Sequence, residues 1–543
     1  MEEEGSILMM ERKVNPIDEK HEVDLTTGSI KTHNSSIFGR KTLCLVLLAL
    51  ATAYFIASLI ITPSSPWGRV AIYLFILAKI LFEFVPLELI TDPIAKLWKP
   101  IDTAAGRIPG RIKGGVAALI IVALALVITF VFEESKNGTR MQRSQSLLEI
   151  AVFIALVAAT SRNFKRINWH TVATGILLQL LVGLFVMKTE VGSNTFTFIS
   201  SMASKLLSFA KLGSRFVFGE AVADAQVFAA IVLPAVLFFA SFVQILYYIG
   251  VMQWIITKSA FFFNFVMNTT VCESVVAAAS PFVGMGESAL LVKPFLVDMT
   301  RSELHQVMTS GFATIAGSVL MAFIGMGLDP KSLITSCVMS IPCSLALSKM
   351  RFPEIEESKT KNIVAHDGEE RESNVLHAAA NGAAQGVTLC LLIAGTLLAV
   401  TSLIALANAL LGLLGSYLGY DKLTLELIGS YLFWPFAWLV GIPSQDCLKI
   451  GELLATKLFT NEFIAYDNLQ AISKKSEITN RSIVLSTYAL CGFANFASIG
   501  IQVGCLGAMA PTRKRDLAEL ALSSMITGTI CTFVSAAIAG LLI

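Results

Sequence analysis

Hydrophobic residues along this chain gather in stretches of about 20, separated by shorter polar or charged segments. A helix that crosses the hydrocarbon core of a bilayer needs about 20 apolar residues, because the core is ~30 Å thick. The stretches that meet or approach this length predict helices at 42–62, 67–86, 114–132, 146–161, 226–248, 305–327, 331–347, 385–415, 426–441 and 517–543. The pattern therefore predicts an all-α polytopic membrane protein.

Three segments depart from this pattern. Residues 1–41 are polar and charged without a period, which is typical of a disordered tail, and residues 349–374 form a strongly hydrophilic linker. Between 170 and 217 the apolar pattern loosens, and apolar and polar side chains interleave at helical spacing: Met202, Leu206 and Phe209 with Ser204, Lys205, Ser208 and Lys211. This spacing favours an amphipathic helix along the membrane surface and is equally compatible with an ordinary core helix.

One apolar stretch contains two glutamates, Glu273 and Glu287, and cannot form a single straight helix. Pro281 removes a backbone donor between them, and Gly284 permits positive φ. Beyond this break the chain reaches Pro294 within a few residues, which is too short to cross the core. A broken, glutamate-bearing segment at membrane depth is tolerated where it lines a cavity or is buried in protein, and transporters build binding sites in this way.

The second half of the chain contains a similar pattern. The octapeptide at 311–318, Gly-Phe-Ala-Thr-Ile-Ala-Gly-Ser, is matched at 492–499 by Gly-Phe-Ala-Asn-Phe-Ala-Ser-Ile. Each copy follows, by some tens of residues, a short apolar segment with a glutamate, Glu287 in the first and Glu462 in the second. Corresponding interrupted segments in two halves predict structural repeats that share one binding site.

The polar side chains of these segments suggest the chemistry of a ligand. A carboxylate at the centre of a membrane helix costs ~2.5–3.5 kcal/mol, so Glu287 and Glu462 need partners or a ligand. Glu462, Asn495 and Ser498 together offer a carboxylate, an amide and a hydroxyl, which suit a polyhydroxylated ligand such as a sugar ring. Asn495 and Ser498 are equally compatible with hydrogen bonds between helices, and Glu273 with an ion pair to a basic residue.

Composition and charge narrow the class further. Hydrophobic residues make up 55% of the chain and charged residues only 15%, which is outside the range of soluble globular proteins. The net charge of +2 argues against a polyanionic partner such as a nucleic acid. The nine cysteines contain no C-x-x-C pair, and the chain has no nucleophile elbow, phosphate loop or zinc pattern. We therefore expect neither a metal centre nor an enzyme.

The distribution of basic residues predicts the topology. Basic side chains gather between the second and third predicted spans: Lys96, Lys99, Arg107, Arg111 and Lys113. Because cytoplasmic loops are enriched in Lys and Arg, this loop and the N-terminus are predicted to be cytoplasmic. The next loop, with the glycosylation acceptor pattern Asn137-Gly138-Thr139, would then be extracellular. Arg513-Lys514-Arg515 precedes the final span, which places the C-terminus outside.

Several motifs, in order along the chain, resemble those of the concentrative nucleoside transporter family: 284–288, 302–305, 311–320, 456–466 and 488–495. The resemblance runs from about residue 110 to the end of the sequence. It implies a homotrimer of elevator-type transporters, in which each protomer has a scaffold and a transport domain with two re-entrant helical hairpins in inverted repeats. Eukaryotic members have eleven crossing helices, three of them extra at the N-terminus, in agreement with the three spans before residue 133.

The resemblance and the predicted spans together imply the following organisation. A disordered cytoplasmic tail (1–41) precedes three extra helices (42–132), scaffold helices with an interfacial helix (133–251) and a first transport repeat with hairpin 1 (252–350). A hydrophilic linker (351–374), a long scaffold helix with its connection (375–446) and a second transport repeat with hairpin 2 (447–543) follow.

The resemblance also implies which residues bind substrate. The base would be held at the tip of hairpin 1 and by two neighbouring apolar side chains: Met285, Gly286, Glu287, Val319 and Phe493. The ribose would be held by Glu462, Asn495 and Ser498. Many members have Gln-Thr where this chain has Met285-Gly286, and neither replacement can hydrogen-bond a base edge in the same way. The preference for purine or pyrimidine nucleosides therefore stays open.

A second departure concerns the coupling ion. The family's sodium site uses an asparagine at the position of Ser280, the carbonyls of Val283 and Ile315, and the hydroxyl of Thr314. Serine is shorter than asparagine, and serine at this position resembles the proton-coupled members, in which the carboxylate at Glu287 is the natural proton carrier. We therefore expect proton coupling, with a sodium site that is at most degenerate.

These observations predict a secondary active symporter that imports nucleosides across the plasma membrane, driven by a cation gradient with H⁺ favoured over Na⁺. No cofactor is expected besides the coupling cation, and the expected partners are nucleosides, the lipid bilayer and two further copies of the chain. A sodium-coupled nucleoside symporter is the alternative within this class. A channel or a membrane scaffold without turnover is the alternative outside it.

Overall fold

The computed structural model describes residues 110–134, 138–224, 227–360, 372–417, 419 and 423–543, together with scattered positions between 49 and 77. Met1–Ala105 forms a unit separate from Gly106–Ile543, and its few described positions are helical. The predicted tail and Asn137 lie outside the described residues, and so do all but these scattered positions of the first two predicted spans. The described part of Gly106–Ile543 contains helices and no strand, which confirms the all-α prediction.

The described part of Gly106–Ile543 begins with the helices that precede hairpin 1. They are α4 (Gly110–Phe130), α5 (Arg140–Ala159), η1 (Phe164–Arg166), α6 (Trp169–Lys188), α7 (Glu190–Phe218), α8 (Glu220–Asp224), α9 (Phe228–Tyr248) and α10 (Val251–Met267). Helix α6 is long and apolar enough to cross a membrane, so the predicted loosening from residue 170 onward was wrong for this helix. Its polar side chains are buried and bonded within the protein: Thr171 donates to the Met267 carbonyl and Gln179 to Ser535 Oγ.

Two series of helices then follow the same plan. The first contains α11 (Val271–Val283), η2 (Glu287–Phe295), α12 (Arg301–Ala313), α13 (Gly317–Gly325) and α14 (Pro330–Arg351). The second contains α17 (Cys447–Phe459), α18 (Glu462–Lys474), α19 (Asn480–Leu490), α20 (Phe496–Met509), η3 (Pro511–Arg513) and α21 (Lys514–Leu542). Each series is a hairpin of two short helices, then a helix interrupted in its middle, then a long helix. The predicted span at 305–327 is thus α12 and α13, broken between Ala313 and Gly317.

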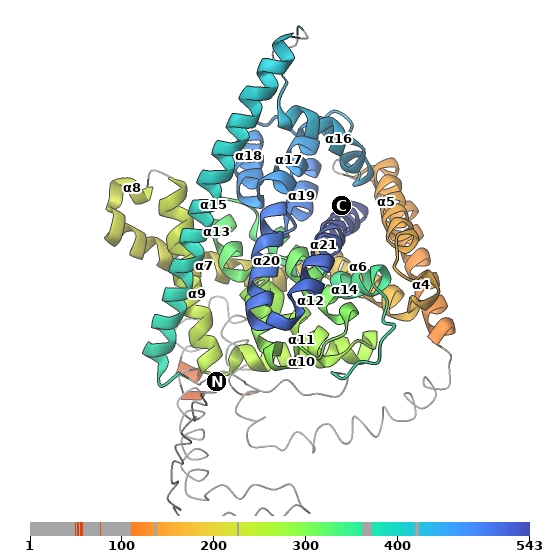
Figure 1. Ribbon diagram of the computed structural model, residues 1–543, viewed down its shortest axis with the longest axis horizontal. Coiled ribbons are helices and arrows are strands. Elements are labelled where there is room, and N and C mark those ends of the chain that lie inside the picture. The colour runs from red at the N-terminus through yellow and green to blue at the C-terminus, as the bar shows by residue number, and fades with distance from the viewer. Residues whose placement is uncertain are drawn as a thin grey trace, which may run out of the picture. The chain divides into compact units, whose positions relative to one another are not determined.

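The long helix α15 (Val375–Tyr417) and α16 (Leu425–Leu439) connect the two series. Helix α15 packs along α9, and these two helices lie on one side of the central helices α12, α14, α20 and α21, with α4 and α5 on the other side (Figure 1). The two helices approach closely at Gly382, where an added Cβ would lie 2.7 Å from the Ala240 carbonyl oxygen. Small residues allow such contacts between membrane helices.

The polar network at the base of hairpin 1 explains where α11 begins. Thr270 caps α11, and its backbone N–H donates to Glu273 Oε2 at 3.0 Å in a reciprocal capping box. The other carboxylate oxygen of Glu273 forms an ion pair with Lys349 near the end of α14, which confirms the expected ion pair to a basic residue. Lys349 also lies 3.3 Å from Glu354, so one lysine joins α11, α14 and the segment that follows α14.

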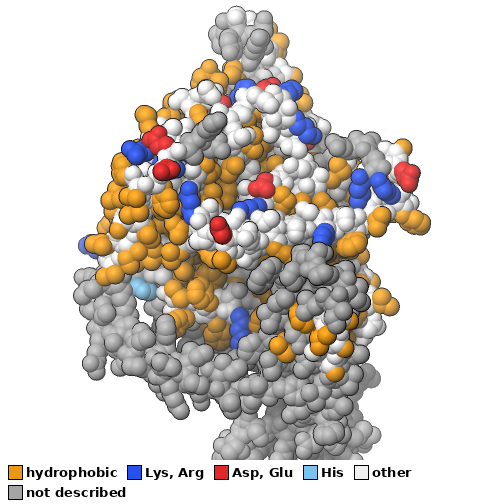
Figure 2. Space-filling view, turned by 180° about the vertical axis from the view of Figure 1, so that it is seen from behind, with side chains coloured by type: hydrophobic (Ala, Val, Ile, Leu, Met, Phe, Trp, Pro, Cys, Tyr) orange, Lys and Arg blue, Asp and Glu red, His pale blue; other side chains and the backbone are white. Residues whose placement is uncertain are grey.

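The outer surface is suited to lipid. Seven helical segments of the described part are long and apolar enough to cross a membrane: Arg140–Ala159, Trp169–Lys188, Ala229–Tyr248, Arg301–Gly325, Pro330–Arg351, Val375–Tyr417 and Pro511–Leu542. Hydrophobic side chains cover much of the described part of the face in Figure 2. Helix α15 is the extreme case, with Leu398 73% and Leu391 69% exposed. The chain is a multi-pass membrane protein.

Candidate functional site

The two hairpin tips and the two helix breaks meet around one cavity of about 350 Å³. The residues that the sequence analysis assigned to substrate binding come from four separate elements, and all of them line this cavity: Met285, Gly286, Glu287, Val319, Glu462, Phe493, Asn495 and Ser498. Residues that are far apart in the sequence are thereby brought to one place, and the volume suits a small ligand.

One end of the cavity is polar and is built from two helix N-termini. Asn495 is the N-cap of α20, and its Oδ1 accepts a hydrogen bond from the Ser498 backbone N–H at 2.7 Å. Its Nδ2 donates to Glu462 Oε2 at 2.9 Å, and Glu462 is the first residue of α18. Helix N-termini carry partial positive charge and free N–H groups, which stabilise the buried carboxylate there. The arrangement presents one carboxylate, one amide and one hydroxyl to a ligand.

The tip of hairpin 1 forms the opposite end. Helix α11 ends at Gly284, where φ of 98° requires glycine. After this turn the Ser288 N–H donates to the Gly284 carbonyl at 3.1 Å, and the chain continues as η2 with Glu287 exposed. Val319 and Phe493 line the same cavity and are nearly buried, with 2% and 8% exposure. Flat apolar walls next to a carboxylate suit an aromatic ring that carries polar groups on its edge.

The residues assigned to the coupling ion lie where the end of α11 meets the break between α12 and α13. A Cβ on Gly284 would lie 3.0 Å from the Ala316 Cβ, so the two segments are in contact. Ser280 Oγ donates to the Val276 carbonyl at 2.8 Å and lies 3.3 Å from Ser288 Oγ. Ser288 is a hydroxyl that the sequence analysis did not consider in this role.

The break between α12 and α13 is joined directly to the break between α19 and α20. The backbone N–H of Phe493 donates to the Thr314 carbonyl at 3.2 Å. A Cβ on Gly492 would lie 2.9 Å from the Phe312 carbonyl oxygen, so the crossing is tight. A residue assigned to substrate binding and a residue assigned to the coupling ion thus share a main-chain hydrogen bond.

Helix α15 contributes a wall that sequence reasoning missed. Gln385 and Thr388 are exposed and line the cavity together with neighbouring leucines of the same helix. Two polar residues three positions apart in an otherwise apolar stretch were the available indication. Cys505 of α20 also lines the cavity, beside Gly286.

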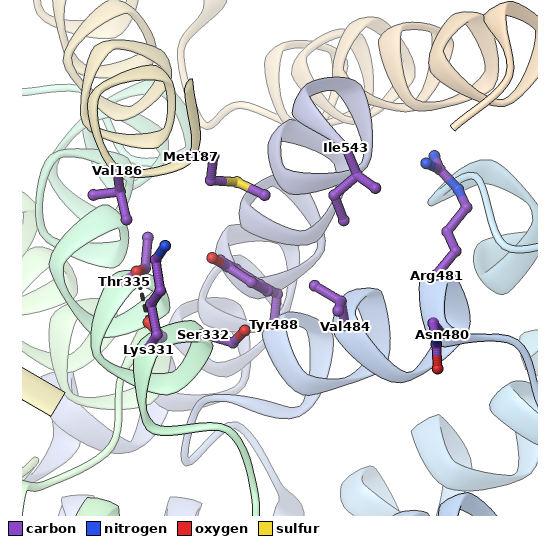
Figure 3. Close-up of a pocket in the computed structure, with 10 residues that line it drawn as sticks. All are labelled: Val186, Met187, Lys331, Ser332, Thr335, Asn480, Arg481, Val484, Tyr488 and Ile543. Carbon is purple, nitrogen blue, oxygen red and sulfur yellow. Dashed lines mark hydrogen bonds between the residues drawn. The ribbon is translucent and has the colours of Figure 1, made fainter. Parts of the chain in front are cut away.

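A second cavity of about 300 Å³ lies between α6, α14, α19 and α21 and contains none of the predicted site residues (Figure 3). Its two cationic side chains already have partners within the protein. Lys331 Nζ donates to Ser193 Oγ at 2.7 Å, and Arg481 donates to the carbonyls of Gly441 and Gly540 at 2.8 and 2.9 Å. Among the described residues, no group of three or more His, Cys, Asp and Glu side chains could hold a metal ion.

Family models match most of the described chain. The Na⁺ dependent nucleoside transporter N-terminus matches residues 148–221, a nucleoside recognition domain matches residues 229–329, and the Na⁺ dependent nucleoside transporter C-terminus matches residues 332–540. Two hairpins and two interrupted helices around one cavity are the arrangement of a secondary transporter, and the matching family is one of transporters and not of enzymes. The chain belongs to the concentrative nucleoside transporter family.

Relatives over most of the chain agree. Sodium/nucleoside cotransporter 1 of Oryctolagus cuniculus is 37% identical over 525 residues, which cover 94% of this chain and 78% of that protein. Sodium/nucleoside cotransporter 2 of Mus musculus is also 37% identical over 529 residues, with the same coverage. Sodium/nucleoside cotransporter 1 of Sus scrofa is 42% identical over 435 residues, which span 66% of its length.

Solved structures agree with the fold. CNTnw in an inward-facing substrate-bound state is 36% identical, with a TM-score of 0.70 over 73% of this chain and 97% of that chain. A CNTnw variant in an outward-facing state gives a TM-score of 0.72 over 74% of this chain and 99% of that chain. The fold is therefore that of an elevator-type nucleoside transporter.

Proposed function

We propose that the protein is a secondary active symporter that imports nucleosides across the plasma membrane. The observation that carries this proposal is the single cavity, which is lined both by the polar group of Glu462, Asn495 and Ser498 and by the apolar side chains of Val319 and Phe493. A nucleoside has the matching division into a hydroxylated ribose and a flat base. The ribose hydroxyls both donate and accept hydrogen bonds, as the polar end requires.

We propose sodium as the coupling ion. The matching family models describe Na⁺ dependent nucleoside transporters, and the relatives are sodium/nucleoside cotransporters. Both support sodium better than the proton coupling expected from Ser280. The geometry offers a reason, because Ser288 Oγ lies 3.3 Å from Ser280 Oγ and adds an oxygen beside the shortened side chain. With the Thr314 hydroxyl and the carbonyls of Val283 and Ile315, a hard cation would have several oxygen ligands. Glu287 as a proton carrier is the second candidate, supported by its position at the cavity.

In the proposed mechanism, the two hairpins carry the sodium ion and the nucleoside across the membrane. They move together past a scaffold that includes α15. The cavity wall supports this division, because both hairpin tips face α15 across the cavity. We also propose a homotrimer with a cytoplasmic N-terminus and an extracellular C-terminus. The exposed apolar side chains of α15 are compatible with either lipid or a second copy of the chain as neighbour.

Uptake of uridine and adenosine by the purified protein in liposomes tests the function and the ion together. An inward sodium gradient at equal pH, an inward proton gradient without sodium, and no gradient form the three arms. We expect accumulation only with sodium. Accumulation with a proton gradient alone would show that the coupling ion is H⁺, with Glu287 as its carrier, and not sodium. Equal uptake in all three arms would indicate a channel.

Two substitutions test the site itself. We expect Glu287→Gln and Glu462→Gln each to abolish uptake while the protein still reaches the membrane, because each removes a charge without changing the side-chain shape. Surface labelling of intact cells is the control for membrane expression. Normal uptake by either variant would contradict the assignment of that residue.

A further inference from the structure

Gln502 on α20 is a buried polar side chain that the proposed mechanism does not use. It is 0% exposed, and neither its Nε2 nor its Oε1 has a hydrogen-bond partner among the described residues. Removal of an amide from water without compensating hydrogen bonds is unfavourable. A carboxamide in this position therefore indicates a partner that is supplied in another state of the protein.

The amide lies beside the tip of hairpin 1. A Cβ on Gly311 of α12 would lie 2.7 Å from the Met285 Cβ and 3.2 Å from Gln502 Nε2. One turn further along α20, Cys505 Sγ would lie 3.0 Å from a Cβ on Gly286. Helix α20 thus runs from Ser498, which lines the cavity, to the tip of hairpin 1, and Gln502 and Met285 both lie next to Gly311 there.

The tip itself offers few hydrogen-bonding side chains to a base. The Met285 thioether is a weak acceptor, Gly286 has no side chain, and Val319 and Phe493 are apolar. A base that enters this end loses the water bound to its edge and needs replacement donors and acceptors. A carboxamide carries one acceptor and two donors in a plane and can pair with a base edge through two parallel hydrogen bonds.

We propose that Gln502 determines specificity at the base end of the cavity: when a nucleoside binds, its carboxamide hydrogen-bonds the edge of the base. Met285 lines the cavity and Gln502 does not, so the Met285 side chain moves aside to admit the amide, which its flexible, unbranched form allows. The amide from α20 thereby replaces the hydrogen-bonding side chains that the hairpin tip lacks. This inference rests on the proposed nucleoside transport.

The test compares transport of adenosine with transport of the unsubstituted purine riboside nebularine in liposomes. Nebularine keeps the ring and the ribose but lacks the exocyclic donor, so it cannot form both hydrogen bonds with an amide. We expect Gln502→Leu to raise the KM for adenosine about tenfold relative to the KM for nebularine, as the loss of one buried hydrogen-bonded pair predicts. Met285→Gln in the same protein returns an amide to the tip, and we expect it to restore the ratio.

A matched control is Gln179→Leu, which removes an equally buried glutamine of α6 whose Oε1 also lacks a partner among the described residues. We expect the ratio of the two KM values to stay at the wild-type value in this variant. Gln502→Glu is the second variant. It keeps the shape of the side chain but loses its donors, and we expect it also to change the ratio.

Two results would overturn the inference. An unchanged ratio in both Gln502 variants would show that the amide does not read the base. An equal loss of uptake for both nucleosides, without rescue by Met285→Gln, would assign Gln502 a purely structural role. Absence of uptake by the wild-type protein would instead contradict the proposed function.

Discussion

Asn495 makes two hydrogen bonds with different roles, one that caps α20 and one to Glu462, and two substitutions can separate these roles. Its Oδ1 caps α20, and such a cap contributes about 1 kcal/mol to stability. Its Nδ2 donates to the buried Glu462 carboxylate at 2.9 Å, and a hydrogen bond to a charged group contributes ~1.5–3 kcal/mol. Asn495→Ala removes both interactions. Asn495→Ser keeps a good N-cap residue but loses the donor to Glu462.

We therefore expect the two variants to differ in stability but not in the direction of their transport defect. Both should lose roughly 10- to 150-fold in kcat/KM for a nucleoside, because Glu462 loses the partner that holds it in place. Both variants should unfold at a lower temperature than the wild type because both lose the hydrogen bond to Glu462, and the alanine variant should unfold at the lower temperature of the two because it also loses the cap of α20. Uptake by purified protein in liposomes measures the first quantity, and thermal unfolding in detergent measures the second.

The two roles of Asn495 can be refuted independently. Wild-type uptake by Asn495→Ser would refute the role of the 2.9 Å hydrogen bond in positioning Glu462. Equal unfolding temperatures for the serine and alanine variants would refute the role of the side chain as the cap of α20.

The remaining predictions concern the tip, the base of hairpin 1 and the ion. Gly311→Ala should lower uptake more than tenfold, because the new Cβ would lie 2.7 Å from the Met285 Cβ. Gly500→Ala is the control, since a Cβ there meets open space, and it should leave uptake unchanged. Equal uptake by the two variants would contradict the close packing at Gly311. Lys349→Met should destabilise the protein by ~3–5 kcal/mol in thermal unfolding, because it leaves Glu273 buried without its ion-pair partner. Adding Glu273→Gln to this variant should restore much of the lost stability. If it does not, the broken ion pair is not the cause. Thr314→Val should raise the sodium concentration for half-maximal uptake; an unchanged value would remove Thr314 from the ion site.

The interrupted, glutamate-bearing segments could be read from the sequence, because proline, glycine and intramembrane carboxylates each have a local physical meaning. The break at Gly284 is present as expected, with φ of 98°. The matched octapeptides likewise correspond to the two helix breaks that touch through Phe493 and Thr314. Two copies of one local pattern were thus sufficient to indicate a shared cavity.

What the sequence could not provide depends on contacts between distant residues. Helix α6 was missed as a crossing helix because residues 170–217 were taken as one loosened stretch, although Trp169–Lys188 alone is long and apolar enough to cross. The sequence also does not show that the one glutamine of this helix, Gln179, donates to Ser535, 356 positions away. Gln502 carried no local indication either, because only the fold shows that its amide is buried without a partner among the described residues. Ser288 became a candidate ligand only through its distance to Ser280.

The hydrogen bond from the Phe493 N–H to the Thr314 carbonyl joins the proposed nucleoside site to the proposed cation site directly, from main chain to main chain. A ligand that orders one helix break therefore lowers the cost of ordering the other, and by thermodynamic linkage the effect is equal in both directions. We therefore expect a carrier built in this way to hold each ligand weakly when alone and both firmly together. Such mutual dependence would keep the cation from crossing unaccompanied and so preserve the gradient that drives accumulation.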